Sequence, residues 1–122
     1  MKTTVLTLSL LAAALATGCG KKEGGGAAQP SAEAKEVYTQ RCASCHGADG
    51  KGTGVAAAAL NPKPRNYADA AWQKSVTDDQ LKKAIIGGGG AIGKSPLMPG
   101  NPDLESKPEV VSGLVAIIRG FQ

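Results

Sequence analysis

The chain has few of the bulky side chains that normally fill a protein interior. Among its 122 residues there are only one Trp, two Tyr and one Phe. The part that could fold, about 90 residues from Ala32 onward, is small for a core that sustains itself. Small domains in oxidising compartments often compensate with several disulfides, but three cysteines are too few for that. We therefore expect a bulky apolar prosthetic group to complete the interior.

Residues 1–18 are predicted to be an export signal. Met1 and Lys2 form a short positively charged start, and an apolar stretch from Val5 to Leu15 follows. That stretch is too short to be a stable membrane span, which needs about 20 apolar residues. We interpret it as a signal peptide that is removed on export.

Cys19 is predicted to be the lipidated first residue of the mature protein. The residues from Leu15 to Cys19 resemble a bacterial lipobox, although Ala16 stands where a larger aliphatic residue is more usual. Two acyl chains would be enough for stable anchoring. The alternative is an ordinary signal-peptidase site at residues 14–16, which would give a soluble periplasmic protein.

Residues 19–31 are predicted to be a flexible tether, and residues 32–122 a single domain. The tether is dense in glycine and has no apolar periodicity. We therefore expect the domain on the periplasmic side of a bacterial membrane, held there by a lipid anchor.

The segment Cys42-Ala43-Ser44-Cys45-His46 has the C-x-x-C-H spacing of c-type haem attachment. Two thiols three residues apart lie on one side of a helical turn, where each can form a thioether with a haem vinyl group. The adjacent imidazole of His46 then serves as the proximal iron ligand. We therefore predict one covalent haem c, bound through Cys42 and Cys45.

Two other uses of a C-x-x-C pair fit less well. A zinc site would need two further ligands, but His46 is the only histidine and Cys19 lies in the predicted tether. A thioredoxin-like dithiol centre would need alternating strands and helices, which the sequence does not show.

From about Ala32 to its C-terminus, the chain resembles a class I c-type cytochrome. In that family a small residue and an aromatic residue stand eight and four positions before the first haem cysteine, and Ala34 and Tyr38 occupy those positions here. The resemblance implies an all-α fold, a small cytochrome c fold of about three to five short helices wrapped around one covalent haem c.

Met98 is predicted to be the distal iron ligand. It is the only methionine left once the signal is removed, and prolines restrain the backbone on both sides of it in Pro96-Leu97-Met98-Pro99-Gly100. This segment resembles the distal ligand loop of the family. A methionine that fills a gap in the core is the structural alternative.

Ligation by histidine and methionine would close both axial positions and leave no place for oxygen or peroxide. We therefore expect an electron-transfer protein and not an enzyme, with no catalytic residues and no small-molecule substrate. Its expected partners are transient protein donors and acceptors. A haem sensor or an accessory module of a membrane redox complex is the main alternative, and a peroxidase-like enzyme is a weaker one.

Four further residues are predicted to lie around the haem. The resemblance implies that a carbonyl in the proline region accepts a hydrogen bond from the proximal histidine, and Pro62 is the candidate. Arg65, Tyr67 and Trp72 lie in a stretch that resembles the one approaching the haem propionates. A surface charge and two packing aromatics are the alternative interpretation of these three.

Three helices are predicted from apolar spacing and caps. The first covers residues 30–41 with Ser31 as its cap, the second opens with a capping box at Thr77 and runs through Ile86, and the last begins near Ser106 or Lys107. The last helix is expected to pack on the first. Residues 87–90, all glycine, are interpreted as slack leading to the methionine loop, because they lack the arrangement of a phosphate-binding loop.

Charge gives little support to nucleic-acid binding. The precursor carries a formal net charge of +4, but residues 31–122 hold 11 basic and 9 acidic side chains, and two haem propionates would bring this sum close to zero. Five lysines are candidates for a modest basic rim around the haem edge that steers an acidic partner, and an ordinary solvated surface is the alternative. These candidates are Lys51, Lys63, Lys82, Lys83 and Lys94.

Overall fold

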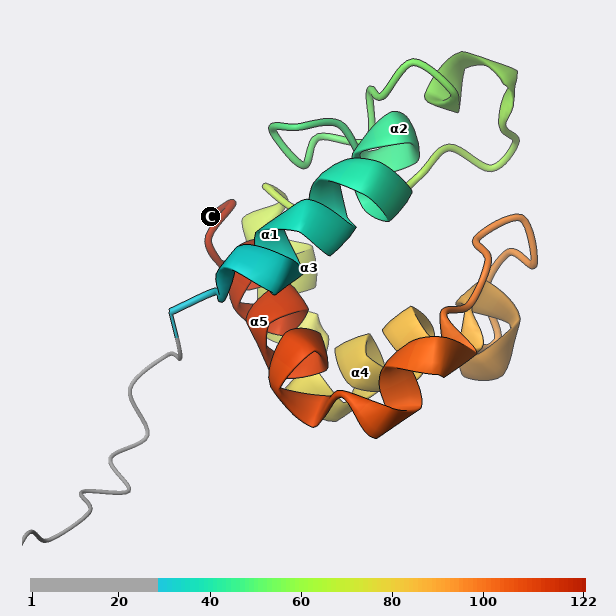
Figure 1. Ribbon diagram of the computed structural model, residues 1–122. Helices are drawn as coiled ribbons and strands as arrows, with labels where there is room; N and C mark the ends of the chain where they lie inside the picture. Colours follow the sequence, from blue (N-terminus) through green and yellow to red (C-terminus); the bar gives the residue numbers. More distant parts are fainter. Residues whose placement is uncertain (1–28) are drawn as a thin grey trace, which may run out of the picture.

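The computed structural model describes residues 29–122, and these residues are helical, with no strand among them (Figure 1). The α-helices are α1 (Ala32–Val37), α2 (Ala43–His46), α3 (Ala70–Ser75), α4 (Asp78–Gly87) and α5 (Pro108–Arg119). Between them lie a π-helix, η1 (Tyr38–Cys42), and three 3₁₀ segments, η2 (Ala57–Ala59), η3 (Gly89–Ile92) and η4 (Pro102–Ser106). The predicted all-α class is confirmed. The predicted signal peptide, Cys19 and most of the tether lie outside the described residues.

The predicted caps form as expected. Ser31 accepts a hydrogen bond from the backbone of Ala34 at the start of α1, and Thr77 and Gln80 form both bonds of a capping box at the start of α4. The helix predicted over residues 30–41 differs in one respect: its second half is a π-helix, because the backbone N–H of Ala43 bonds to the carbonyl of Tyr38, five residues back. This π turn leads directly into α2.

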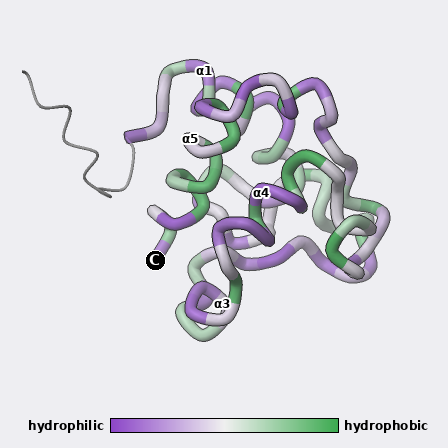
Figure 2. Tube along the Cα trace, turned by 90° about the horizontal axis from the view of Figure 1, so that it is seen from below, coloured by the Kyte–Doolittle hydropathy of each residue, from purple (hydrophilic) through white to green (hydrophobic). Residues whose placement is uncertain are grey.

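Helices α1 and α5 cross at two small residues, which confirms the predicted packing of the terminal helices. Ala34 is fully buried, and a Cβ atom added to Gly113 would lie only 2.6 Å from the Cβ of Ala34. The backbones of the two helices therefore approach closely. Helix α5 is one of the most hydrophobic stretches of the trace (Figure 2), and it buries Val110, Val111, Leu114, Val115 and Ile118.

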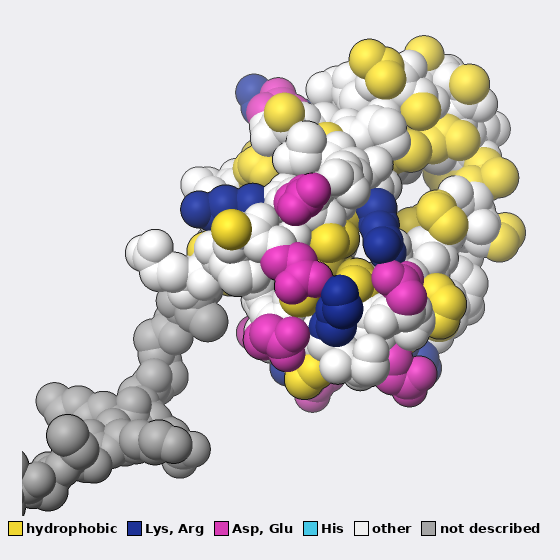
Figure 3. Space-filling view, in the orientation of Figure 1, with side chains coloured by type: hydrophobic (Ala, Val, Ile, Leu, Met, Phe, Trp, Pro, Cys, Tyr) yellow, Lys and Arg dark blue, Asp and Glu magenta, His cyan; other side chains and the backbone are white. Residues whose placement is uncertain are grey.

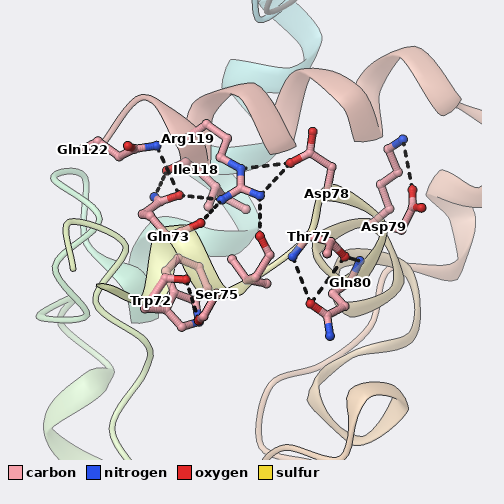
Figure 4. Close-up of polar contacts among 12 residues, drawn as sticks. Trp72, Gln73, Ser75, Thr77, Asp78, Asp79, Gln80, Ile118, Arg119 and Gln122 are labelled. Carbon is pink, nitrogen blue, oxygen red and sulfur yellow. Dashed lines mark hydrogen bonds and ion pairs between the residues drawn. The ribbon is translucent and has the colours of Figure 1, made fainter. Parts of the chain in front are cut away.

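A polar cluster joins the ends of α3, α4 and α5 (Figure 4). The guanidinium of Arg119 donates to the carbonyl of Val76 at 2.7 Å, to the carbonyl and side-chain oxygen of Gln73 at 2.7 and 2.9 Å, and to Asp78 at 2.7 Å. Gln73 is only 3% exposed, and its amide group donates to the carbonyls of Tyr67 and Ile118 at 2.7 and 2.8 Å. Arg119 thus satisfies backbone carbonyls that helix ends leave without partners.

Two arms extend from this helical body toward each other (Figure 1). We call residues 38–67, which contain η1 and α2, the histidine arm, and residues 88–103, which contain η3, the methionine arm. In Figure 3 the molecule is hollowed between the two arms, and hydrophobic side chains lie on both sides of the hollow. Within residues 29–122, none of the helices is long and apolar enough to cross a membrane.

The crossing of α1 and α5 predicts that Gly113→Val destabilises the protein. The added side chain would overlap Ala34, and overpacking of this kind costs about 2 kcal/mol. Chemical denaturation of the haem-loaded protein would measure this loss. Gly90→Ala is the matched control, because a Cβ atom there has no neighbour within 4 Å. Equal stability of the two variants would contradict the close crossing.

The polar cluster predicts that Arg119→Met is destabilising by about 2 kcal/mol, since it leaves the carbonyl of Val76 and the buried side chain of Gln73 without this partner. The midpoint and slope of urea denaturation are the measurements. Lys74→Met, a substitution of an exposed basic residue on α3, controls for the loss of a positive charge. If both variants unfold at the same urea concentration, the contacts of Arg119 with the three helices do not add to the free energy of unfolding.

Candidate functional site

The C-x-x-C-H residues lie on the continuous turn formed by η1 and α2. Cys42 ends η1, while Cys45 and His46 belong to α2. Both cysteines are free thiols with half-buried side chains, and His46 is buried, with 7% of its surface exposed. A π turn often marks a functional position in a helix. Here it immediately precedes the residues predicted to attach the cofactor.

His46 is held in one orientation by two neighbours. Its Nδ1 atom lies 3.2 Å from the backbone carbonyl of Arg65, and its ring stacks on that of Tyr67 at a centroid distance of 4.4 Å. Because a carbonyl only accepts hydrogen bonds, Nδ1 carries the proton and Nε2 keeps its lone pair. Burial lowers the pKa of His46 and so favours the neutral imidazole, which is the form that binds a metal ion.

The prediction that Pro62 supplies the carbonyl for His46 is wrong, because the structure gives this hydrogen bond to Arg65, three residues later. The backbone N–H of Gly52 donates to the carbonyl of His46 at 2.7 Å, and Gly52 also lies directly against the carbonyl of Pro64. This close approach brings the backbone of residues 64 and 65, rather than Pro62, to the imidazole. Gly52 has a φ of +76°, so a side chain there would be strained as well as crowded.

The thiol of Cys42 is not activated as a nucleophile. Burial raises its pKa to about 11, whereas the reactive cysteines of dithiol redox centres have lowered pKa values. Within residues 29–122, no group of three His, Cys, Asp or Glu side chains is placed to hold a metal ion. The described residues therefore favour neither a dithiol redox centre nor a zinc site.

The three residues predicted to approach the propionates do lie together beside His46. The ring of Tyr67 is 5.5 Å from that of Trp72, and the guanidinium of Arg65 lies 5.7 Å from the centroid of the Trp72 ring. Arg65 also forms an exposed ion pair with Asp69 at 3.7 Å. Burial raises the pKa of Tyr67, so its hydroxyl is protonated and remains a hydrogen-bond donor. Contact of these side chains with propionates stays a prediction.

Two residues that sequence reasoning missed support this group. Phe121 packs its ring 5.7 Å from Tyr38 and 6.2 Å from Tyr67, so all four aromatic residues of the chain gather on one side of the histidine arm. Gln73 holds the carbonyl of Tyr67. A glutamine between a tryptophan and a lysine gives no clear sequence signal of burial, and its role becomes visible only when α5 is in place.

Met98 lies on the methionine arm with its side chain half-buried. Its carbonyl accepts a hydrogen bond from Gly89 at 3.1 Å, and its N–H donates to Ser95 at 3.3 Å. Our interpretation of residues 87–90 as slack is wrong: Gly88 has a φ of +77°, and an added Cβ atom would lie 2.7 Å from the carbonyl of Met98. Gly88 and Gly89 thus allow close contact between the end of α4 and the methionine segment.

Two of the five lysines of the predicted basic rim lie beside an acidic residue, and a third donates to backbone carbonyls. Lys51 and Lys82 lie 3.9 and 3.7 Å from Asp49 and Asp79, and the ammonium group of Lys63 donates to two backbone carbonyls at the end of η2. A basic rim that steers an acidic partner stays a prediction.

The donor set and the hollow together fit a covalently attached haem. Two free thiols and a neutral, oriented imidazole lie on the histidine arm, and a thioether lies on the arm that faces it across the hollow (Figure 3). A separate surface depression of about 550 Å³, lined by residues such as Thr39, Ser44 and Val55, contains none of the four predicted haem or iron ligands. It is too open to enclose a cofactor.

The family model described as Cytochrome c matches residues 31–120. A solved structure, the KustC0563 c-type cytochrome, is 32% identical to this chain; the match covers 73% of this chain and 96% of that one, with a TM-score of 0.57. A comparison with curated proteins gives no match. Cytochromes c hold haem c covalently and in general carry electrons rather than catalyse reactions. The family match and the solved neighbour show that this chain belongs to the cytochrome c family.

Proposed function

We propose that the protein carries single electrons between redox partner proteins through one haem c whose iron is bound axially by His46 and Met98. The observation that carries this proposal is the state of His46: its Nδ1 atom bonds to the Arg65 carbonyl, so that Nε2 keeps its lone pair, in a residue that directly follows the pair of free cysteines. Haem supplies an iron that changes its charge by one electron. The side chains around the haem would attach it, supply the ligands of its iron and keep those ligands in place.

Each of the four ligands has a separate role. Cys42 and Cys45 would hold the cofactor through two thioethers, and His46 would supply the nitrogen ligand of its iron. The thioether of Met98 is a soft ligand that favours the reduced iron and so raises the potential. Because the carbonyl of Arg65 and the ring of Tyr67 fix the imidazole, the proximal ligand changes its position little when the charge changes.

An iron with no open ligand position distinguishes an electron carrier from a haem sensor or a peroxidase. If His46 and Met98 both bind the iron, no open coordination position would remain for a substrate or a signalling gas. A haem sensor or accessory module would instead bind carbon monoxide readily in the reduced form at neutral pH. Nothing in the described residues favours that second function.

We also propose that the domain is held at the periplasmic side of a bacterial membrane through Cys19. The support for this proposal is the lipobox-like sequence and the glycine-rich tether that follows it. The domain itself begins near Ser31, where the cap of α1 forms. The tether would let it turn toward donors and acceptors near the membrane.

Replacing Met98 tests the distal ligand. Met98→Ala is expected to lower the reduction potential, to remove the methionine-to-iron absorption band of the oxidised protein and to open the iron to imidazole and carbon monoxide. Potentiometric titration and absorption spectra measure these changes. Leu97→Ala removes an exposed neighbouring side chain and is the control. An unchanged potential in the Met98 variant would exclude it as a ligand.

Replacing Cys19 tests the anchor. Cys19→Ser is expected to move the protein from the membrane fraction to the soluble periplasmic fraction, while the haem spectrum stays the same. Mass spectrometry of the mature wild-type protein is the second measurement and should show a diacylated Cys19. A mature wild-type chain that begins before Cys19 and carries no lipid would rule the anchor out and leave the electron carrier intact.

A further inference from the structure

One residue makes all the direct polar links between the two arms. Among the described residues, every hydrogen bond and ion pair between residues 38–67 and 88–103 involves Arg41. Its Nη1 atom lies 3.0 and 2.9 Å from the two carboxylate oxygens of Asp103, and 3.3 Å from the side-chain oxygen of Asn101. Arg41 is the residue directly before Cys42.

Asn101 connects this contact to the end of α4. Its backbone N–H donates to the carbonyls of Ile85 and Ile86 at 3.0 and 2.9 Å, and its amide group donates to Ile85 at 2.9 Å. Asn101 stands three residues after Met98 in the chain. The segment that leaves Met98 is thus held on one side by α4 and on the other by Arg41.

From these contacts, and resting on the proposed ligation by Met98, we propose that Arg41 is a positioning residue that keeps Met98 on the iron. Thioethers from Cys42 and Cys45 would tie the cofactor to the histidine arm, next to Arg41. Met98 approaches from the other arm, so the distance between the arms decides how well the thioether reaches the metal. Without the link to Asp103 and Asn101, the arms would be joined only through the helical body.

The free energy that the Arg41–Asp103 ion pair contributes is limited by its exposure to solvent. The side chains of Arg41 and Asp103 are 42% and 56% exposed, so the pair contributes little to global stability and is weakened by salt. A small contribution still matters for a ligand bond, because it shifts the equilibrium between bound and displaced methionine directly.

The chain contains a matched control for this contact. Lys107 and Glu33 form an ion pair of 2.7 Å with exposures of 47% and 50%, and it also joins the N-terminal helical segment to the region of η4. Glu33 lies at the start of α1, far along the chain from Cys42, whereas Arg41 lies beside it. Loss of either pair removes the same kind of interaction.

The experiment compares Asp103→Asn with Glu33→Gln in the haem-loaded full chain. In Asp103→Asn we expect oxidised iron to bind imidazole about two- to fivefold more tightly, which corresponds to the loss of one exposed ion pair, together with a weaker methionine-to-iron band. Glu33→Gln should bind imidazole like the wild type. Asp103→Glu, which keeps the charge, should restore the wild-type affinity and band.

Salt gives an independent measurement. Raising the ionic strength should bring the imidazole affinity of the wild type toward that of Asp103→Asn, because the ion pair is screened, while the variant changes less. If Asp103→Asn and Glu33→Gln bind imidazole equally at low salt, the inference is wrong. If Met98→Ala also binds imidazole like the wild type, Met98 is not the ligand, and the proposed function itself fails.

Discussion

The close crossing of α1 and α5 is the contact on which the arrangement of the two arms depends. Ala34 and Gly113 leave no room for a larger side chain, so the two backbones approach closely. From one end of this pair the chain continues through η1 into the histidine arm, and the segment before α5 closes the methionine arm. Ile117 on α5 is only partly buried, and the four aromatic residues pack against one another beside the histidine arm.

The environment of His46 is supported by a series of contacts that reaches the far end of the chain. Its ring stacks on Tyr67, the carbonyl of Tyr67 is held by Gln73, and Gln73 is held by Arg119 on α5. A buried polar network stabilises and rigidifies a protein most when every polar group in it has a hydrogen-bond partner. Among the described residues, no buried side-chain N or O atom lacks a hydrogen bond. The C-terminal helix therefore contributes to the site without contributing a ligand.

Features set by neighbouring residues could be predicted from the sequence, and features set by distant ones could not. The capping box at Thr77 depends on four adjacent residues, and the fold class followed from a motif and its flanking spacing. The choice of Arg65 over Pro62 as the partner of His46 depends on how closely Gly52 approaches the loop, which no local pattern encodes. The cluster around Arg119 joins three helices that are remote in sequence. The ligand roles of the two cysteines, His46 and Met98 agree with this geometry and stay predictions.

The π turn at Tyr38–Cys42 changes the direction in which side chains point along one continuous helical segment. An extra residue in a helical turn rotates everything after it by about 100° relative to a regular α-helix. Ala34, before the π turn, contacts Gly113 of α5, while Cys42 and His46 lie at the end of the π turn and beyond it. The length of this segment is consequently under tighter constraint than its composition. The exposed residues Thr39 and Gln40 could be exchanged without loss of buried contacts, but a chain with one residue fewer here would rotate its attachment motif by about 100° relative to Ala34.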